Sequence, residues 1–542
     1  MEELEVYNMS KKNIKSSFKF IVDFDLVSNK FYFDTIDFQN INSLDIIIEF
    51  PISITSFRNH DYSWVAISQD RIANDFSPKA IQLQNGLYIQ ANINFGIWEI
   101  NAKNPKQLLW RFNPEFAAPI TQYCNENNTK KIVSAQADIV FVEKPALLIS
   151  SNGIVEISRS PIPFSAIACF TDHCDFDTLE NLKIQREFFK EKGIKITKGF
   201  FLNHFSKRVS NASFENNSSE IEDWQQDGHE LCYHSLSQSI RNDAEAFDEF
   251  NNFSPPFTNI PVWIDHGFQP YNFTLYKKNG ISNDKYESTL LNKNISVLWN
   301  YIDTGTATSG VLNQLDSNQF TLKNYLDSIK EQTFSKRIPS LLKNIVFHFD
   351  NNEFRIRNYI DTISYSKAFL KNKKLGVIFK LFKNGIPLLL LFFKVLITWN
   401  SSKKLTYKVA KYSPIFFKHK IANKEFTVFQ TIEMVDFISA LSPNNIDTFV
   451  ESSGLFIAHT YFSVNSNNYL GKLINSNATL NEKVVSNFSY LSKKIEQKTL
   501  WNPTLSQLLE HYSNFQNTVF DLDENGAITL KNNYNIPSRN IK

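Results

Sequence analysis

Cysteine is scarce in this chain. Among its 542 residues there are only four cysteines, Cys124, Cys169, Cys174 and Cys232, and no two of them form a C-x-x-C pair. This argues against a disulfide-stapled fold and against a zinc site built from thiolates. We interpret Cys174 and Cys232 as small packing residues, and so few cysteines are typical of a reducing compartment.

Long apolar runs are also missing. No segment offers about 18 uninterrupted apolar residues, so the sequence predicts no ordinary membrane-spanning helix. The first residues, M-E-E-L-E-V-Y-N-M-S-K-K, begin with acids and do not resemble a secretory signal. We therefore expect a cytoplasmic protein.

Two common functional motifs do not occur. The chain contains no G-x-S-x-G sequence, which places a nucleophilic serine on a tight turn in one large class of hydrolases. It also contains no glycine-rich loop of the kind that cradles phosphates. Nucleophilic serine catalysis and nucleotide hydrolysis are therefore not supported by the sequence.

Apolar and aromatic residues, in contrast, are plentiful. Hydrophobic residues make up 42% of the chain and aromatic residues 14%, including 49 phenylalanines. A chain of this composition buries large cores, and its length predicts more than one domain. Residues 1–155 alternate short apolar runs with turn residues, as in L-D-I-I-I-E-F, which predicts an N-terminal β-rich, sandwich-like domain.

The pattern changes after residue 155. Strand-like and helix-like segments alternate over 156–311 and again over 425–542, and Gly193 follows a charged helical segment where a C-terminal cap belongs. This alternation predicts an α/β fold with a parallel sheet or barrel, which carries its chemistry at the carboxyl ends of the strands. Residues 312–424 interrupt the pattern and look mostly helical.

Acidic residues are absent from one long stretch. Between Thr362 and Lys424 there are fourteen lysines and no Asp, Glu or Arg, and the rest of the chain has 43 basic against 55 acidic residues, a formal charge of −12. Gly385 and Pro387 predict a break in the apolar centre of this stretch. One interpretation is a helical subdomain with a solvated lysine face. The other, which the missing acids favour, is that residues 371–400 lie on an anionic membrane surface. Nucleic acid is not expected, because the centre is too apolar.

Two segments carry carboxylates and imidazoles in a spacing that suggests chemistry. Residues 170–178 read F-T-D-H-C-D-F-D-T, and residues 228–239 read G-H-E-L-C-Y-H-S-L-S-Q-S. Each follows or ends an apolar run that reads as a strand. Carboxylates and imidazoles delivered from separate strand ends can hold a divalent metal, which polarises a carbonyl group and lowers the pKa of water.

These two segments and a third, G-L-F-I-A-H-T-Y-F around His459, resemble in order and context the motifs of the polysaccharide deacetylase superfamily (carbohydrate esterase family four). The resemblance covers roughly 156–310 and 425–515. It implies a distorted (β/α) barrel, with 312–424 as an insertion, and metal-dependent removal of an acetyl group from a sugar. The implied partners are an acetylated sugar or a lipid-linked glycan in the synthesis of a surface polysaccharide or glycolipid.

The resemblance also implies roles for individual residues. Asp175 would be the catalytic base and Asp177 a metal ligand, and an alternative register uses Asp172 with Asp175. His234 begins the second motif and would be a second ligand. The position of the next ligand histidine holds Gln238, a weak neutral ligand.

Three further expectations complete the site. His266, in P-V-W-I-D-H-G, would take the place of the missing ligand, or Gln238 itself would bind. His459 would act as the general acid or support it. The metal would be zinc, and the enzyme would sit peripherally on the inner face of the membrane. The alternative that Gln238 raises is a non-catalytic carbohydrate-binding or scaffolding protein on a degenerate barrel.

Overall fold

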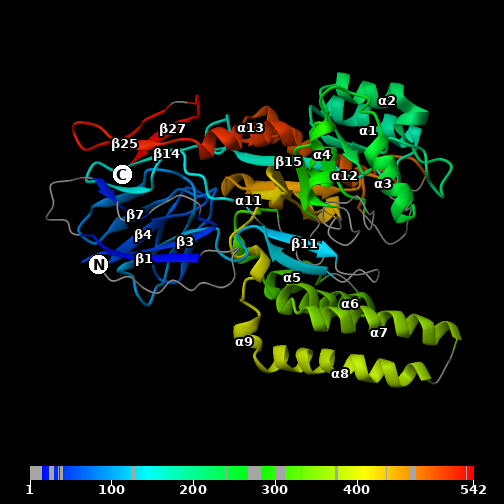
Figure 1. Ribbon diagram of the computed structural model, residues 1–542, viewed down its shortest axis with the longest axis horizontal. Helices are drawn as coiled ribbons and strands as arrows, with labels where there is room; N and C mark the ends of the chain where they lie inside the picture. The colour runs from blue at the N-terminus through cyan, green and yellow to red at the C-terminus, as the bar shows by residue number, and fades with distance from the viewer. Residues whose placement is uncertain are drawn as a thin grey trace.

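The computed structural model describes most of the chain. The described residues are 15–22, 30–33, 36, 41–123, 130–135, 137–239, 241–266, 282–300, 312–330, 333–372, 376–434, 436–463, 471–475, 477–532 and 534–542. Figure 1 shows a strand-rich N-terminal part, a mixed helix and strand part, and a set of long helices that extends from one side.

The N-terminal part consists mainly of strands, as the sequence predicts. One sheet has the order β1-β3-β10-β9-β6, and a second has the order β2-β13-β8-β7-β4-β5. Their bounds are β1 Lys15–Ile21, β2 Lys30–Tyr32, β3 Ser43–Glu49, β4 Ile54–Arg58, β5 Trp64–Ala66, β6 Arg71–Ala73, β7 Ala80–Leu83, β8 Tyr88–Ala91, β9 Ile97–Ile100, β10 Gln107–Phe112 and β13 Ala146–Ser150. Side chains from both sheets, among them Ile46, Ile89 and Trp110, share one buried cluster. The two sheets therefore pack face to face.

A second, larger sheet forms the centre of the α/β part. Its order is β20-β21-β19-β18-β17-β16-β15-β23-β22, with β24 also paired to β15. The bounds are β15 Ala166–Asp172, β16 Thr197–Phe200, β17 Glu230–His234, β18 Val262–Ile264, β19 Val297–Asn300, β20 Phe416–Ile421, β21 Lys424–Gln430, β22 Ile432–Glu433, β23 Leu455–Thr460 and β24 Leu500–Trp501. Every described pairing is parallel except β20 with β21. All of β15 is buried, as expected for a central parallel strand.

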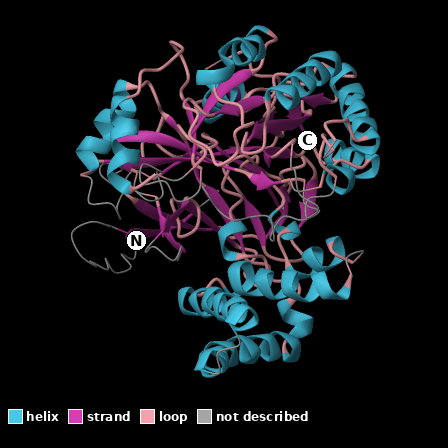
Figure 2. Ribbon diagram, turned by 90° about the vertical axis from the view of Figure 1, so that its right-hand side faces the viewer, coloured by secondary structure: helices cyan, strands magenta, loops and turns pink. Residues whose placement is uncertain are grey.

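This sheet is curled like part of a barrel. Only Thr431 separates β21 from β22, yet β21 pairs with β19 and β22 pairs with β23 near the other end of the strand order. The two ends of the sheet must therefore approach each other, and the Trp299 indole nitrogen donates to Thr431 Oγ1 at 2.9 Å where they do. Figure 2 shows strands in the interior with helices around them. The fold is a mixed α/β fold built on a curled sheet.

Helices connect the parallel strands. They are α1 Leu179–Lys192, α2 Phe214–Gln226, α3 Asp243–Asn252, α4 Asn283–Asn292, α10 Phe437–Ala440, α11 Pro443–Glu451, α12 Glu482–Glu496 and α13 Leu505–Gln516. Thr178 caps α1 by accepting a hydrogen bond from the Asn181 backbone, and Gly193 ends it in the left-handed conformation. The predicted cap at Gly193 is confirmed.

Between β19 and β20 the chain forms the helical segment that the sequence predicts. It contains α5 Leu322–Ser328, α6 Phe334–Asn344, a π-helix Ile345–Asp350, α7 Glu353–Asn372, α8 Gly376–Ile397, α9 Trp399–Ser402 and 3-10 turns at Ser317–Gln319 and Lys408–Ala410. The predicted break at Gly385 and Pro387 is wrong, because α8 continues through both. A proline removes one backbone hydrogen bond but has a φ that an α-helix accepts, and the packing of α8 on one side holds the helix together. No helix among the described residues is long and apolar enough to cross a membrane.

The end of the chain returns to the N-terminal part. β27 Ser538–Ile541 pairs with β14 Ile154–Ile157, and just before it β25 Phe520–Leu522 pairs with β26 Ile528–Leu530. A separate two-stranded sheet earlier in the chain pairs β11 Pro119–Tyr123 with β12 Lys130–Ser134. Glu156 accepts from Arg58 and from Arg539 in a buried ion cluster, which ties together segments far apart in the sequence.

Candidate metal centre

The conspicuous histidines gather at one edge of the curled sheet. His173 follows β15, His234 ends β17, His266 follows β18 by two residues, and His459 lies near the end of β23. These strands are parallel members of one sheet, so their carboxyl ends meet at the same edge. The two sequence motifs and the third segment are therefore brought together, as the sequence predicts.

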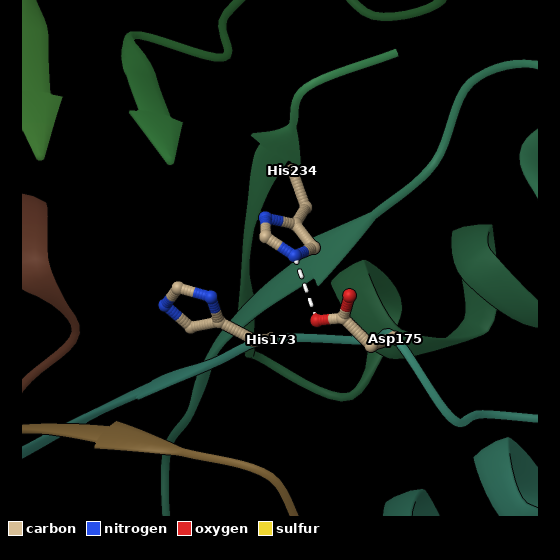
Figure 3. A group of neighbouring side chains, drawn as sticks. All are labelled: His173, Asp175 and His234. Atoms are coloured by element: carbon tan, nitrogen blue, oxygen red, sulfur yellow. Dashed lines mark hydrogen bonds and ion pairs between the residues drawn. The ribbon is translucent and has the colours of Figure 1, made fainter. Parts of the chain in front are cut away.

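Asp175 lies between two of these histidines. Its Oδ2 is 2.9 Å from Nε2 of His234, and its Oδ1 is 2.5 Å from Nε2 of His266. Figure 3 shows Asp175 and His234 turned toward each other from different strand ends. The carboxylate thus uses one oxygen for each imidazole.

His173 completes the group, although the sequence did not single it out. Its ring lies edge-on to that of His234, with 4.6 Å between centroids, and stacks on the ring of His459 at 3.7 Å. In Figure 3 one ring nitrogen of His173 is turned toward the other two residues. His173, Asp175 and His234 each offer one ligand atom, and these atoms all lie within 4.8 Å of one another.

Burial sets the charge of this group. Burial lowers the pKa of His173 well below its usual value, and the neighbouring histidines lower it further. The pKa of His234 is also lowered, because burial outweighs the attraction of Asp175. Burial alone would raise the pKa of Asp175, but His266 and His234 together hold it well below its usual range. At neutral pH the group is a carboxylate facing neutral imidazoles, the forms that bind a divalent metal.

Hydrogen bonds that involve the backbone position His234 and His266. Ser235 has a left-handed φ of 50° and donates its backbone N–H to the Ile264 carbonyl at 2.9 Å. Its Oγ accepts a hydrogen bond from the backbone N–H of His266 at 2.8 Å. Nδ1 of His234 lies 3.4 Å from the same Ile264 carbonyl. The turn after β17 therefore couples the orientation of His234 to that of His266.

Gln238 supports the site without reaching the histidines. Its side-chain amide donates to the backbone carbonyl of Asp175 and accepts from the hydroxyl of Ser206. Asn211 and Arg208 donate to the same carbonyl, each at 3.0 Å. The expected ligand role of Gln238 is not supported by these contacts, because its oxygen is used by Ser206 and its nitrogen positions the loop that carries Asp175.

Asp172 and Asp177 belong to a different cluster. Both carboxylates pair with the buried Lys198 of β16, and the distance from Lys198 Nζ to Asp177 Oδ2 is 2.6 Å. Lys198 also donates to Gln185 at 2.9 Å, which uses the third hydrogen of the ammonium group. Gln185 in turn donates to Asp177 Oδ1 at 2.7 Å, and Thr460 donates to Asp172 Oδ1 at 3.3 Å. All four carboxylate oxygens are engaged.

Two sequence-based roles concern residues of this second cluster. The ligand role expected for Asp177, and the alternative register through Asp172, have no support in these contacts, because both side chains are already paired with an internal ammonium group. Burial raises the pKa of Asp172 to about 7, against the opposing attraction of Lys198. Although burial alone would lower the pKa of Lys198, the two aspartates raise it, so the lysine stays charged.

Three buried cysteines and His459 lie on or next to the same strands. Cys169, Cys174 and Cys232 are buried, and burial raises the pKa of each thiol well above its usual value, as expected for cysteines that pack and do not react. His459 is buried, with its ring stacked on His173 and edge-on to Trp299. His459 therefore packs against His173, and its expected role as general acid stays a prediction.

Two sequence signals could have found the residues that were overlooked. His173 directly follows β15, so it emerges at the carboxyl end of a parallel strand, the same edge at which His234 ends β17. Lys198 stands directly before the apolar run G-F-F-L in a segment that reads as a strand, where a buried lysine requires carboxylate partners.

The group can hold a divalent metal ion. Two imidazoles and a carboxylate are a donor set that suits zinc and other first-row metals, and a further imidazole lies beside the carboxylate. The carbonyl contacts of Asp175 and the backbone contacts of His234 provide the supporting shell that such sites need. No protein-family model matches this chain, and a comparison with curated proteins found no match.

Proposed function

We propose that this chain is a divalent-metal-dependent hydrolase whose ion is held by His173, Asp175 and His234. The observation that carries the proposal is the convergence of these three side chains, from two strand ends, to within 4.8 Å of one another. Zinc fits the nitrogen and oxygen donors best, and the ligand atoms of a tetrahedral zinc site lie roughly 3.3 Å apart.

The contacts of His234 support this assignment. When Nδ1 carries the ring hydrogen and donates to the Ile264 carbonyl, the lone pair on Nε2 points at Asp175 Oδ2, 2.9 Å away. In that tautomer Nε2 and Oδ2 both present lone pairs, and a positive charge bound by both would hold them together. A bound divalent ion supplies that positive charge, and it also supplies Lewis acidity to a carbonyl group of the substrate.

His266 is the residue we assign to proton transfer. Its side chain is 20% exposed, against 1% for that of His234, and its Nε2 pairs with Asp175 Oδ1. The contact with the carboxylate orients the imidazole, so His266 can accept a proton from water as the water oxygen attacks an acyl carbon. The same proton then passes to the leaving nitrogen or oxygen as its bond to carbon breaks.

The substrate class rests on the order of the motifs. The three segments around Asp175, His234 and His459 resemble those of polysaccharide deacetylases, and the curled sheet is compatible with the barrel of that family. We therefore propose an acetylated sugar, free or lipid-linked, as the substrate and acetate as one product. The sequence-based assignment had Asp175 as the catalytic base and His266 as a metal ligand. In the present proposal Asp175 is the metal ligand and His266 is the base.

The test combines metal analysis with acetate release from N-acetylated amino-sugar oligomers. His234→Ala is expected to lose both bound metal and activity. His266→Gln is expected to keep its metal and to lose about 10²- to 10⁴-fold in kcat, as removal of a proton-transfer group usually does. The matched control is His229→Gln, which alters a buried histidine outside the group. Equal metal content in wild type and His234→Ala would remove the proposed ligand set.

One observation favours a second function. Because Asp172 and Asp177 both pair with Lys198, Asp175 is the one carboxylate of the first motif that faces the histidines. A site with a single carboxylate fits a non-catalytic carbohydrate-binding protein on a degenerate barrel as well. Binding of the same oligomers without acetate release, in protein loaded with zinc, would favour this function over hydrolysis.

A further inference from the structure

One face of α8 exposes an unusual number of large apolar side chains. Eight of them are between 49% and 85% exposed: Phe379, Phe382, Ile386, Leu389, Leu390, Phe393, Leu396 and Ile397. Their spacing follows the 3.6-residue period of the helix, so they form one continuous stripe. Monomeric proteins rarely expose a contiguous apolar patch larger than a few hundred Å², and such patches mark interaction surfaces.

The exposure does not come from poor packing of the helix. The opposite face of α8 buries Leu388, Leu391 and Val395 in a cluster with residues of the π-helix and α7. Figure 1 shows α7 and α8 at the outer end of the helical segment, away from the N-terminal strands and from the curled sheet. The helix is therefore held firmly on one side while its apolar stripe faces outward.

Positive charge borders this stripe. Lys380, Lys383 and Lys394 are exposed, and the helical period places all three along the same edge of the apolar face. None of the three forms an ion pair with a carboxylate among the described residues. Lysines in this position can keep the ammonium group in water while their stems lie along apolar surface.

The surrounding sequence contains no negative charge to complement these lysines. From Thr362 to Lys424 all fourteen charged residues are lysines. Another copy of the same face would bring apolar residues together, but it would offer these lysines no acidic partner. The complementary surface must therefore combine an apolar layer with negative charge.

We propose that α8 docks on an anionic lipid bilayer, lying in the headgroup layer with its apolar stripe toward the acyl chains. A helix with an apolar stripe and a cationic edge binds in the plane of the interface, where buried apolar area and attraction to anionic lipid act together. This inference is independent of the proposed hydrolase function, because it uses no residue of the metal-binding group.

The test is flotation of the full-length protein with phosphatidylcholine vesicles and with vesicles of phosphatidylcholine mixed with phosphatidylglycerol. We expect retention on the mixed vesicles that decreases with added salt, and little retention on phosphatidylcholine alone. Replacing Phe379, Phe382 and Phe393 together by Ser is expected to abolish retention. Replacing Lys380, Lys383 and Lys394 together by Gln should weaken binding on the order of 100-fold, since each lysine near an anionic surface contributes about 1 kcal/mol.

Two controls make the outcome decisive. The matched charge control replaces the exposed Lys103, Lys483 and Lys493 by Gln and should bind vesicles like wild type. The variant His234→Ala should also bind like wild type, so failure of the metal site leaves this test intact. Unchanged retention of the triple phenylalanine variant would overturn the proposal. So would a wild-type dimer that ignores the vesicles and becomes monomeric in that variant, a result that assigns the face to a second copy of the chain.

Discussion

Two buried clusters of ionisable side chains lie at the end of β15. They differ in how many of their polar atoms find a hydrogen-bond or ion-pair partner within the fold. Around Lys198, three ammonium hydrogens and four carboxylate oxygens all have partners within the fold. Around Asp175, neutral imidazoles face a carboxylate, and Nε2 of the buried His173 has no hydrogen-bond partner among the described residues. The first cluster needs nothing from outside, and the second is suited to a cation.

Within residues 170–178, Asp172 and Asp177 therefore have a structural role, and Asp175 is the aspartate suited to bind a ligand. A fully paired buried network stabilises the fold only as a complete set, because removal of one partner leaves uncompensated charge. A cluster that leaves a place for a cation depends on the ligand for part of its stability. Four predictions test this division, from the largest expected effect to the smallest.

The largest effect is expected at Lys198. Lys198→Met leaves Asp172 and Asp177 buried without a cation and should lower the free energy of unfolding by about 3–5 kcal/mol, measured by urea denaturation. Restoring neutrality with Asp172→Asn and Asp177→Asn in the same chain should recover most of that loss. Lys190→Met is the control, since Lys190 is 61% exposed and its ion pair contributes little. If Lys198→Met were as stable as the control, the cluster would not be the structural unit described above.

The second prediction concerns metal-dependent stability. Zinc at about 100 times its Kd should raise the free energy of unfolding by about 2.7 kcal/mol, and a chelator should remove that gain. His234→Ala should abolish the effect of zinc. The triple variant Lys198→Met, Asp172→Asn and Asp177→Asn should still be stabilised by zinc. An equal loss in both variants would show that the two clusters act as one site.

His229, outside both clusters, sharpens the comparison, because burial is the largest cause of its lowered pKa. Burial lowers the pKa of His229 to about 4, and its Nδ1 accepts the Ile196 N–H at 3.2 Å. In the unfolded chain His229 is protonated near pH 6.5, whereas in the folded chain it stays neutral. The stability that neutral His229 allows is therefore fully present above pH 6.5 and is lost as the pH falls toward 4. His229 should therefore account for about 2 kcal/mol of the stability lost between pH 7 and pH 5.

The measurement for His229 is the difference in unfolding free energy between the two pH values. His229→Gln should reduce this pH dependence by the stated amount, and wild type and variant should have the same slope above pH 7. An unchanged slope between pH 7 and pH 5 would mean that His229 is protonated in the folded protein.

The smallest effect is expected at Gln238. Gln238→Ala removes one of three donors to the Asp175 carbonyl and should weaken zinc binding about tenfold, as loss of a supporting hydrogen bond usually does, against a far larger loss for His234→Ala. Isothermal titration measures both. Gln226→Ala, an exposed glutamine on α2, is the control. A loss at Gln238 as large as that at His234 would restore Gln238 as a ligand.

Much of the fold follows from sequence patterns. Alternation of period two predicts the N-terminal strands, the strand and helix rhythm predicts the parallel sheet, and Gly193 marks the end of α1 as expected. The break at Gly385 and Pro387 was predicted wrongly. Local propensity disfavours both residues in a helix, but the buried face of α8 outweighs that preference.

The site was predictable in its location and less so in its members. Asp175, His234 and His266 come together as the strand ends require, but Asp172 and Asp177 do not join them. Three aspartates within six residues look alike in sequence. Their roles differ because the direction of each side chain, and the lysine on the adjacent strand, decide which carboxylate is neutralised within the fold.

By itself the sequence determined which chemical groups are available and at which strand ends they emerge, because hydrophobic periodicity and turn residues are local properties. It also determined the one-sided charge of residues 362–424. Only the tertiary structure decided that Lys198 takes two carboxylates out of use, that His173 turns toward Asp175, and that the stripe on α8 is left uncovered. Those outcomes depend on contacts between segments distant along the chain, and no local pattern encodes such contacts.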